Sequence, residues 1–356
     1  MPVTFSFPSN YPIAELKRLE KELEANLCVV PSYLPPSVGK LNFMALAYQK
    51  NIEQLEIQIL PDLNIVLRIA RAAKGNINFD RTSRIAFHLA ALAHLTDLQF
   101  EPSIAIHELA HQQGHKAGLE LLRDFRAADN APAEQWLDLS KDVKRELQIK
   151  LADAEVPGDL SAPLRRWKMN RLAILKIAAL ELNQSLSHRS RMEAFIRWMR
   201  EEYFLAGPAA LLATMYFAPS SPRSDLLKKL RSAVRSRAIE GINNESWDLT
   251  HLSDFANKAT GGLDGPSRYL FASTDQKLCV FASLMLHRDE AALAKATTQA
   301  LQQWWPYKDA FEIASRLVES VLEARDRTIS PLASKGSEWL VRETATLEAV
   351  IYSWRP

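Results

Sequence analysis

Residues 56–64 read Glu-Ile-Gln-Ile-Leu-Pro-Asp-Leu-Asn, an apolar run that ends at Asp62 just where a helical pattern begins. Residues 268–278, Arg-Tyr-Leu-Phe-Ala-Ser-Thr-Asp-Gln-Lys-Leu, repeat this arrangement with Asp275. Each pattern predicts a buried strand, over 56–60 and 268–273, with a carboxylate at its C-terminal end. Because ligands in open α/β sheets bind at that edge, we expect the two strands to be parallel neighbours whose acids share a site.

Outside these two stretches the apolar spacing is helical. The prediction is therefore an α/β fold, predominantly helical overall, in which a small parallel Rossmann-like sheet is buried under extensive helical additions. We expect an N-terminal helical extension over 1–50 and a main domain over 51–356, with a helical insertion at about 115–240. The predicted helices are 13–26, 44–55, 63–73, 82–95, 103–128, 133–152, 164–184, 190–204, 208–217, 225–239 (capped by Ser224), 245–258, 275–286, 289–303, 308–325 and 338–350, and 349–354 is a candidate added strand.

Bulk composition excludes several classes of protein. The chain has 356 residues and a net charge of +2, so no nucleic-acid partner is demanded by overall charge. Two cysteines, Cys28 and Cys279, form neither a disulfide framework nor a thiolate zinc site. No signal peptide and no apolar run of roughly 18 residues is present, which predicts a cytoplasmic protein with no membrane partner. The sequence contains neither a Gly-rich phosphate loop nor a Gly-x-Ser-x-Gly motif.

Four acids form the candidate catalytic and metal-binding set: Asp62, Glu108, Asp248 and Asp275. Glu108 lies on a predicted helix that starts after Pro102, and Asp248 lies in the predicted first turn of 245–258. Carboxylates that converge repel each other unless a cation lies among them, and Mg²⁺ or Mn²⁺ prefers carboxylate oxygens. The chemistry expected of such a site is metal-assisted attack of water on a phosphodiester. Each acid alone has a simpler interpretation, as a helix cap or a first-turn acid.

The same residues resemble the PIN-domain nucleases. That family has a strand ending in Asp-x-Asn, matched by Asp62 and Asn64, and a helical Glu after a Pro-containing turn, matched by Glu108. Its last strand runs into Ser/Thr-x-Asp-x-x-Leu, similar to residues 273–278. A bacterial PIN-like subgroup carries Asn-x-x-Trp-Asp before that strand, similar to residues 244–248.

The resemblance covers about 100 residues in three patches and implies a PIN-like, metal-dependent ribonuclease. It implies that the four acids bind Mg²⁺ or Mn²⁺ and that Asn64, Thr274 and Asn244 support them. Two features depart from the family pattern, Pro61 in place of an apolar residue and Leu63 in place of Thr or Ser. The implied partner is RNA or another single-stranded nucleic acid, and a second copy of the chain or an antitoxin-like protein is a further candidate.

A rival interpretation comes from His107-Glu108-Leu109-Ala110-His111, a literal His-Glu-x-x-His. On a helix the two histidines could bind zinc, with Glu108 as general base of a metallopeptidase. A third ligand is lacking, because His115 would lie about 12 Å along one continuous helix at 1.5 Å per residue. The default role of these histidines is structural.

Three basic clusters, at 165–171, 188–191 and 228–237, could meet phosphates, and Trp167 could stack on a base. A solvated helix face explains each cluster equally well. The third alternative for the whole chain is a non-catalytic helical interaction protein that retains a decayed nuclease core.

Overall fold

The structure is a computed structural model that describes residues 7, 9, 11–32, 41–75, 77–150, 156–221, 227, 229–261, 265–286, 290–326 and 330–355. The chain divides into two compact units. The first contains Met1–Ala162 and Lys258–Cys279, and the second contains Pro163–Asn257 and Val280–Pro356. These boundaries differ from those expected from the sequence, since residues 1–50 and 115–162 belong to the unit that holds the sheet.

A four-stranded mixed sheet lies in the first unit, in the order β1-β4-β2-β3. It is formed by β1 (Val29–Pro31), β2 (Glu56–Pro61), β3 (Gln99–Phe100) and β4 (Ser267–Ala272). Strand β2 pairs in parallel with both β4 and β3, whereas β1 pairs antiparallel with β4. The predicted parallel pairing of the two acid-bearing strands is therefore confirmed, and the predicted all-parallel sheet is wrong at its β1 edge.

The register of β2 and β4 brings their C-terminal ends together. Ile59 pairs with Leu270, and Pro61 pairs with Ala272, the last residue of β4. Pro61 is tolerated because a proline at a strand end removes no ladder hydrogen bond that the pairing needs. The side chains of Ile59 and Leu270 are fully buried. Both strands thus end at the same level, and residues 62 and 273 are the first beyond the sheet.

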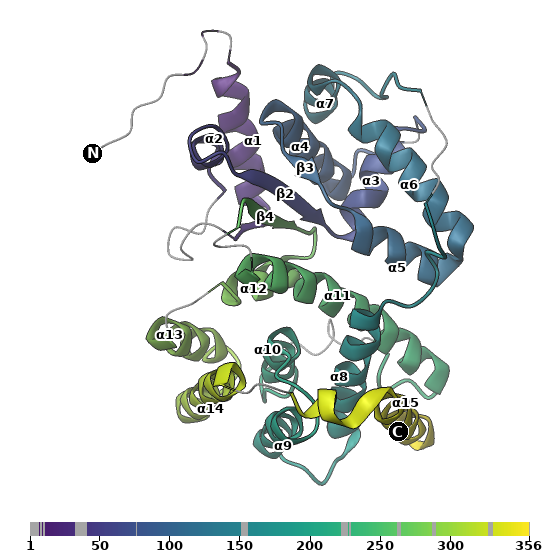
Figure 1. The fold of residues 1–356 in the computed structure, drawn as a ribbon, viewed down its shortest axis with the longest axis vertical. Coiled ribbons are helices and arrows are strands. Elements are labelled where there is room, and N and C mark those ends of the chain that lie inside the picture. Colours follow the sequence, from purple (N-terminus) through teal and green to yellow (C-terminus); the bar gives the residue numbers. More distant parts are fainter. Residues whose placement is uncertain are drawn as a thin grey trace. The chain divides into compact units, whose positions relative to one another are not determined.

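Seven helices lie wholly within the first unit in the described part of the chain (Figure 1). Among them α3 packs on α4, α5 and α6, and α4 also packs on α1 and α7. The helices are α1 (Ile13–Ala25), α2 (Phe43–Asn51), α3 (Leu63–Ala72), α4 (Arg81–Leu95), α5 (Ser103–Gln113), α6 (His115–Asp129) and α7 (Ala133–Ser140).

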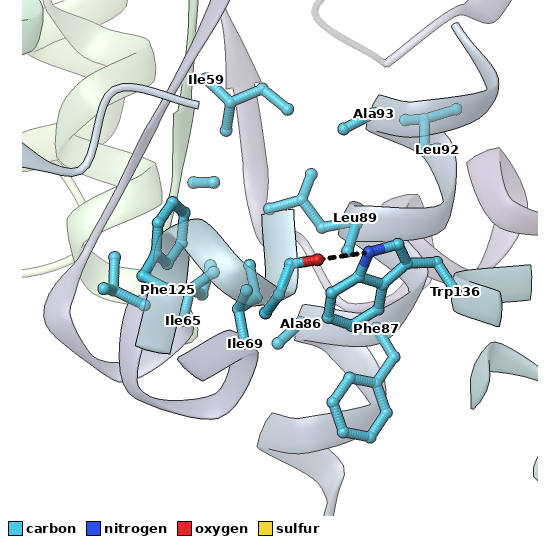
Figure 2. Close-up of a cluster of buried hydrophobic side chains, with 14 of the residues drawn as sticks. Ile59, Ile65, Ile69, Ala86, Phe87, Leu89, Leu92, Ala93, Phe125 and Trp136 are labelled. Carbon is cyan, nitrogen blue, oxygen red and sulfur yellow. Dashed lines mark hydrogen bonds between the residues drawn. The ribbon is translucent and has the colours of Figure 1, made fainter. Parts of the chain in front are cut away.

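The core of the first unit lies between the sheet and these helices. Ile59 of β2, Ile65 and Ile69 of α3, and Leu89 of α4 are at most 1% exposed (Figure 2). Trp136 of α7 is fully buried, and its indole N–H donates to the carbonyl of residue 128 at 3.2 Å. Burial of such side chains contributes about 1.5–3 kcal/mol each, which holds α3, and hence residue 62, in place.

The regular secondary structure in the described part of the second unit is entirely helical. Helix α8 packs on α9, α10 and α15, and α14 packs on α9 and α13. The helices are α8 (Arg165–Leu182), α9 (His188–Glu201), α10 (Gly207–Tyr216), α11 (Arg235–Gly261), α12 (Gln276–Leu284), α13 (Glu290–Leu301), α14 (Tyr307–Asp326) and α15 (Pro331–Ser353), of which α11 and α12 cross the unit boundary along the chain.

Four elements correct the sequence predictions. The predicted helix 103–128 breaks at Gly114, whose φ of 97° lies in the left-handed region. The helix predicted over 133–152 ends at Ser140. Helix α11 begins at Arg235, so the helix predicted over 225–239 is wrong at 229–234, and α11 runs without a break through the predicted 245–258 helix; Ser224 lies outside the described residues. Residues 349–353 end α15, so the added strand predicted at 349–354 is wrong.

Candidate active site at the sheet edge

Asp62 caps helix α3 from a buried position. Its Oδ1 accepts a hydrogen bond from the backbone N–H of Ile65 at 2.9 Å, and the Asp62 backbone is extended, as an N-cap requires. Its Oδ2 accepts a hydrogen bond from the hydroxyl of Ser273 at 2.6 Å. The residue is only 4% exposed. The cap interpretation of Asp62 is thus confirmed, and the same carboxylate faces the end of β4.

Asp275 lies at the start of α12 and is exposed. Its backbone N–H donates to Ser273 Oγ at 2.9 Å, and its Oδ1 accepts from the N–H of Lys277 at 2.8 Å. Ser273 is fully buried, and its hydroxyl therefore joins Asp62 to the backbone of Asp275. Ser273 thus bonds the carboxylate of Asp62 and the backbone of Asp275.

The third parallel strand also ends in an acid, which the sequence analysis did not select. The N–H of Glu101 donates to the carbonyl of Ile59 at 2.8 Å and so continues the β2–β3 ladder. Its Oε1 accepts from the N–H of Ser103 at 3.1 Å, at the start of α5. Every parallel strand of the described sheet is therefore followed by a carboxylate. In the sequence, Glu101 stands between the apolar Phe100 and the helix start at Pro102-Ser103, a placement like that of Asp62. Strand β3 has only two residues, however, and was not predicted.

The supporting side chains differ from those expected. Asn64, in the first turn of α3, is exposed, and Thr274 is half-buried. Within the described part of the chain, neither side chain hydrogen-bonds to Asp62 or Asp275. Ser273 makes the contacts that would orient the acids.

Asp248 and Asn244 belong to the second unit, whereas Asp62, Glu108 and Asp275 belong to the first. Both residues lie inside α11, more than two turns from its first residue, Arg235. The prediction that Asp248 occupies a first helical turn is therefore wrong, and so is its interpretation as a cap. The convergence of the four acids remains a prediction.

Glu108 projects from α5, where its Oε1 accepts from the side-chain amide of Gln112 at 3.3 Å. In the described ranges, no three His, Cys, Asp or Glu side chains form a group that could hold a metal ion. Mg²⁺ can be bound by as few as one or two carboxylates together with water and substrate phosphates. Ser273 contacts both acids, Asp62 at its carboxylate and Asp275 at its backbone N–H.

The histidines of the His-Glu-x-x-His segment contact one short loop. Nδ1 of His107 lies 3.0 Å from the carbonyl of Leu160, and Nδ1 of His111 lies 3.2 Å from the carbonyl of Ser161. Nδ1 of His115 accepts from the N–H of Leu160 at 3.0 Å. Because α5 and α6 are separate helices, the continuous helix assumed between His107 and His115 is wrong. The three rings all hydrogen-bond to the backbone of residues 160–161, as a structural role requires.

Both cysteines flank Ser273. The carbonyl of Cys28 accepts from the N–H of Ser273 at 3.0 Å, and Cys279 Sγ donates to the Ser273 carbonyl at 3.6 Å. Burial raises the pKa of the Cys28 thiol to about 12. Burial, and to a lesser extent Cys28 and Asp62, raises the pKa of Cys279 still further. Both groups are therefore neutral thiols that pack under the sheet edge.

The basic clusters of the second unit are largely neutralised. Arg191 and Arg231 both bond Glu181, at 3.0 and 2.7 Å, and Arg166 pairs with Asp254. Such pairing favours the interpretation of these clusters as structural or solvated faces.

Comparisons of the chain with protein-family models, with curated proteins and with solved structures yield no match. The function of the sheet edge must therefore be inferred from its own residues. Among the described helices, none is both long and apolar enough to cross a membrane.

Proposed function

We propose that this protein is a metal-dependent nuclease that hydrolyses RNA phosphodiester bonds at the C-terminal edge of β2 and β4. The observation that carries the proposal is the hydrogen-bonded link from Asp62 through Ser273 to Asp275, at the ends of two parallel strands. Both acids lie at the C-terminal edge of parallel strands, which is the place where α/β sheets bind ligands. RNA is proposed as the substrate because the acid-bearing motifs resemble those of PIN-domain nucleases.

In this proposal, Asp62 and Asp275 hold Mg²⁺ or Mn²⁺. Glu101, which follows β3, and Glu108, on α5, are further acids of the same unit. When bound, the cation lowers the pKa of a water molecule and neutralises charge that develops on the phosphate. Asp62 is rigid because it caps α3 and accepts the Ser273 hydroxyl, whereas exposed Asp275 can reach solvent and substrate. Each carboxylate oxygen has two lone pairs, so one hydrogen bond leaves its capacity as a ligand intact.

A zinc peptidase centred on His107, Glu108 and His111 is less well supported. Both Nδ1 atoms lie against backbone carbonyls, an arrangement that structural histidines and metal-bound histidines share. The acid edge offers oxygen donors and strand-end placement together, which favours the nuclease.

The test is hydrolysis of single-stranded RNA in the presence of Mn²⁺, with Asp275→Asn as the decisive variant. We expect a loss of about a hundredfold or more in kcat, because a group that stabilises transition-state charge is removed with little change in volume. Asp97→Asn is the matched control, since Asp97 is an exposed carboxylate of the same unit that pairs with Lys50. Equal turnover in the wild type and Asp275→Asn, or no Mn²⁺-dependent cleavage by the wild type, contradicts the proposal.

A further inference from the structure

A second feature of the first unit is a polar cavity of about 490 Å³ between α1, α4 and the end of α7. Four cationic side chains line it, Arg18, Arg81, Arg84 and Lys141. Its lining contains no Phe, Tyr or Trp, so it offers no surface on which a base would stack. The cavity is large enough for a small ligand or for a segment of a polymer.

The charges around this cavity leave one cation in excess. Glu15 bonds both Arg18, at 3.1 Å, and Lys141, at 2.5 Å. Asp142 pairs with Arg84 at 2.8 Å, and Glu22 is the third carboxylate nearby.

Arg81 is the cation in excess. Its Nε donates to Asn26 Oδ1 at 3.0 Å, and its guanidinium has no carboxylate partner in the described chain. His88 adds no charge at neutral pH, because burial lowers its pKa and its ring lies 3.1 Å from the carbonyl of Ser140. A single phosphodiester, with one negative charge, matches this excess.

The cavity borders the candidate active site through Asn26. The Asn26 side chain bonds Arg81 within the cavity, and its carbonyl accepts from the Gln276 side-chain amide at 3.1 Å. Gln276 directly follows Asp275, and two residues after Asn26 the carbonyl of Cys28 bonds Ser273. One short segment, 26–28, therefore has the cavity on one side and the acid edge on the other.

We propose that this cavity binds one phosphodiester of the RNA strand, with Arg81 as its principal contact, and so positions the neighbouring bond at Asp62 and Asp275. This inference rests on the proposed nuclease function. A guanidinium can hold two phosphate oxygens at once, which fixes the strand without reading its bases. The absence of aromatic rings among the lining residues agrees with recognition of the backbone alone.

The test is RNA binding by the full chain in EDTA, so that affinity is measured without cleavage. A short fluorescein-labelled single-stranded RNA is titrated by fluorescence anisotropy over a range of KCl concentrations. We expect Arg81→Gln to weaken binding about tenfold and to reduce the slope of log K against log[KCl] by about 0.7, the value for one single-stranded phosphate. Arg81→Lys should keep the slope of log K against log[KCl], because the charge is kept. It should lose part of the affinity, because lysine lacks the planar guanidinium that bonds two phosphate oxygens at once.

The matched control is Arg126→Gln, which removes the same charge from an exposed position on α6, and thermal unfolding checks that each variant is folded. Unchanged binding by Arg81→Gln, an equal loss in Arg126→Gln, or no RNA binding by the wild type overturns the inference. If the wild type binds RNA through Arg81 but cleaves none in Mn²⁺, the nuclease proposal fails and the phosphate site stands. If RNA is cleaved in Mn²⁺ at the same rate with and without Arg81, the nuclease proposal stands and the phosphate site fails.

Discussion

The hydroxyl of Ser273 donates to Asp62 Oδ2 at 2.6 Å and joins two strand ends that lie 211 residues apart in the sequence. The same oxygen accepts the backbone N–H of Asp275 at 2.9 Å. One buried serine therefore couples the pairing of β2 and β4 to the placement of both acids. Ser273 therefore links the stability of the sheet to the proposed catalytic site, and mutation can separate the two.

Ser273→Ala should lower the free energy of unfolding by about 1.5–3 kcal/mol, since it leaves a buried carboxylate oxygen without this donor. The measurement is urea unfolding followed by circular dichroism. Ser103→Ala, at an exposed serine on α5, should change stability by no more than about 0.5 kcal/mol. Equal stability of the two variants would show that the Ser273 hydroxyl contributes nothing to the fold.

Asp62 has two separable roles, as the cap of α3 and as a proposed metal ligand. Asp62→Asn should keep the cap, because asparagine caps helices about as well as aspartate, but its amide nitrogen cannot accept the Ser273 hydroxyl, so it should lose Mn²⁺-dependent cleavage and about 1.5–3 kcal/mol of unfolding free energy. Asp62→Ala should lose cleavage, the same hydrogen bond and also the cap, which adds about 0.5–2 kcal/mol. Urea unfolding and RNA hydrolysis are measured on both. If Asp62→Asn still cleaves RNA, Asp62 only caps α3 and is not a metal ligand.

The His107→Ala, His111→Ala double variant should keep RNA hydrolysis within about tenfold, a loss of at most roughly 1.4 kcal/mol in transition-state stabilisation. Its effect should be local, because both rings contact the carbonyls of Leu160 and Ser161. Faster amide exchange in residues 156–162 is the expected signature. Elemental analysis should find no stoichiometric zinc in the wild type. One zinc per chain, lost in the double variant, would favour the peptidase instead.

The two buried thiols predict a loss of stability at high pH. In the unfolded chain a thiol loses its proton above about pH 8.5, whereas in the folded chain the pKa of Cys28 is about 12 and that of Cys279 is also raised. The two thiols therefore make their full contribution to the free energy of unfolding below about pH 8.5. That contribution declines as the pH rises toward the pKa values of the folded chain. At pH 10 the decline is about 2 kcal/mol for each thiol. Urea unfolding at pH 8 and pH 10 measures it, and a Cys28→Ala, Cys279→Ala variant should show a smaller difference.

Glu181→Gln should strongly destabilise the second unit. Glu181 is fully buried and bonds Arg191, itself nearly buried, and Arg231. Removal of one partner from a buried ion pair costs about 3–5 kcal/mol, because the remaining charge stays buried. Glu240→Gln is the control, since its pair with Lys229 is exposed and is worth at most about 1 kcal/mol. Similar urea midpoints for the two variants would contradict this expectation.

The parts of the fold that were predictable from the sequence are those with long periodic patterns. Strands β2 and β4 were found because several consecutive apolar residues ended at a polar residue that begins a helix. Strands β1 and β3 were missed because three and two residues are too few to show any period. The break at Gly114 was missed because helical spacing continues on both sides, and only the positive φ of the glycine separates α5 from α6.

The candidate site was predictable only in part, for a physical reason. Asp62 and Asp275 follow strands, and sheet pairing fixes strand ends relative to each other. Glu101 follows a strand too short to be predicted, and Ser273 reaches Asp62 through a hydrogen bond between distant segments. No local pattern encodes such bonds. Asp248 lies on a helix of the other unit, where sequence spacing gives no information about its neighbours.

The strand order has a consequence for biosynthesis. Strand β4 lies between β1 and β2, yet its last residue is translated 211 residues after the last residue of β2, when much of the second unit has already been made. At about 5–20 residues per second, a nascent chain carries β2 without its inner partner for roughly 10–40 seconds. During that time an apolar strand edge is open to pairing with other chains. We expect the yield of folded protein in cells to depend on translation rate and on chaperones that cover this edge until β4 leaves the ribosome.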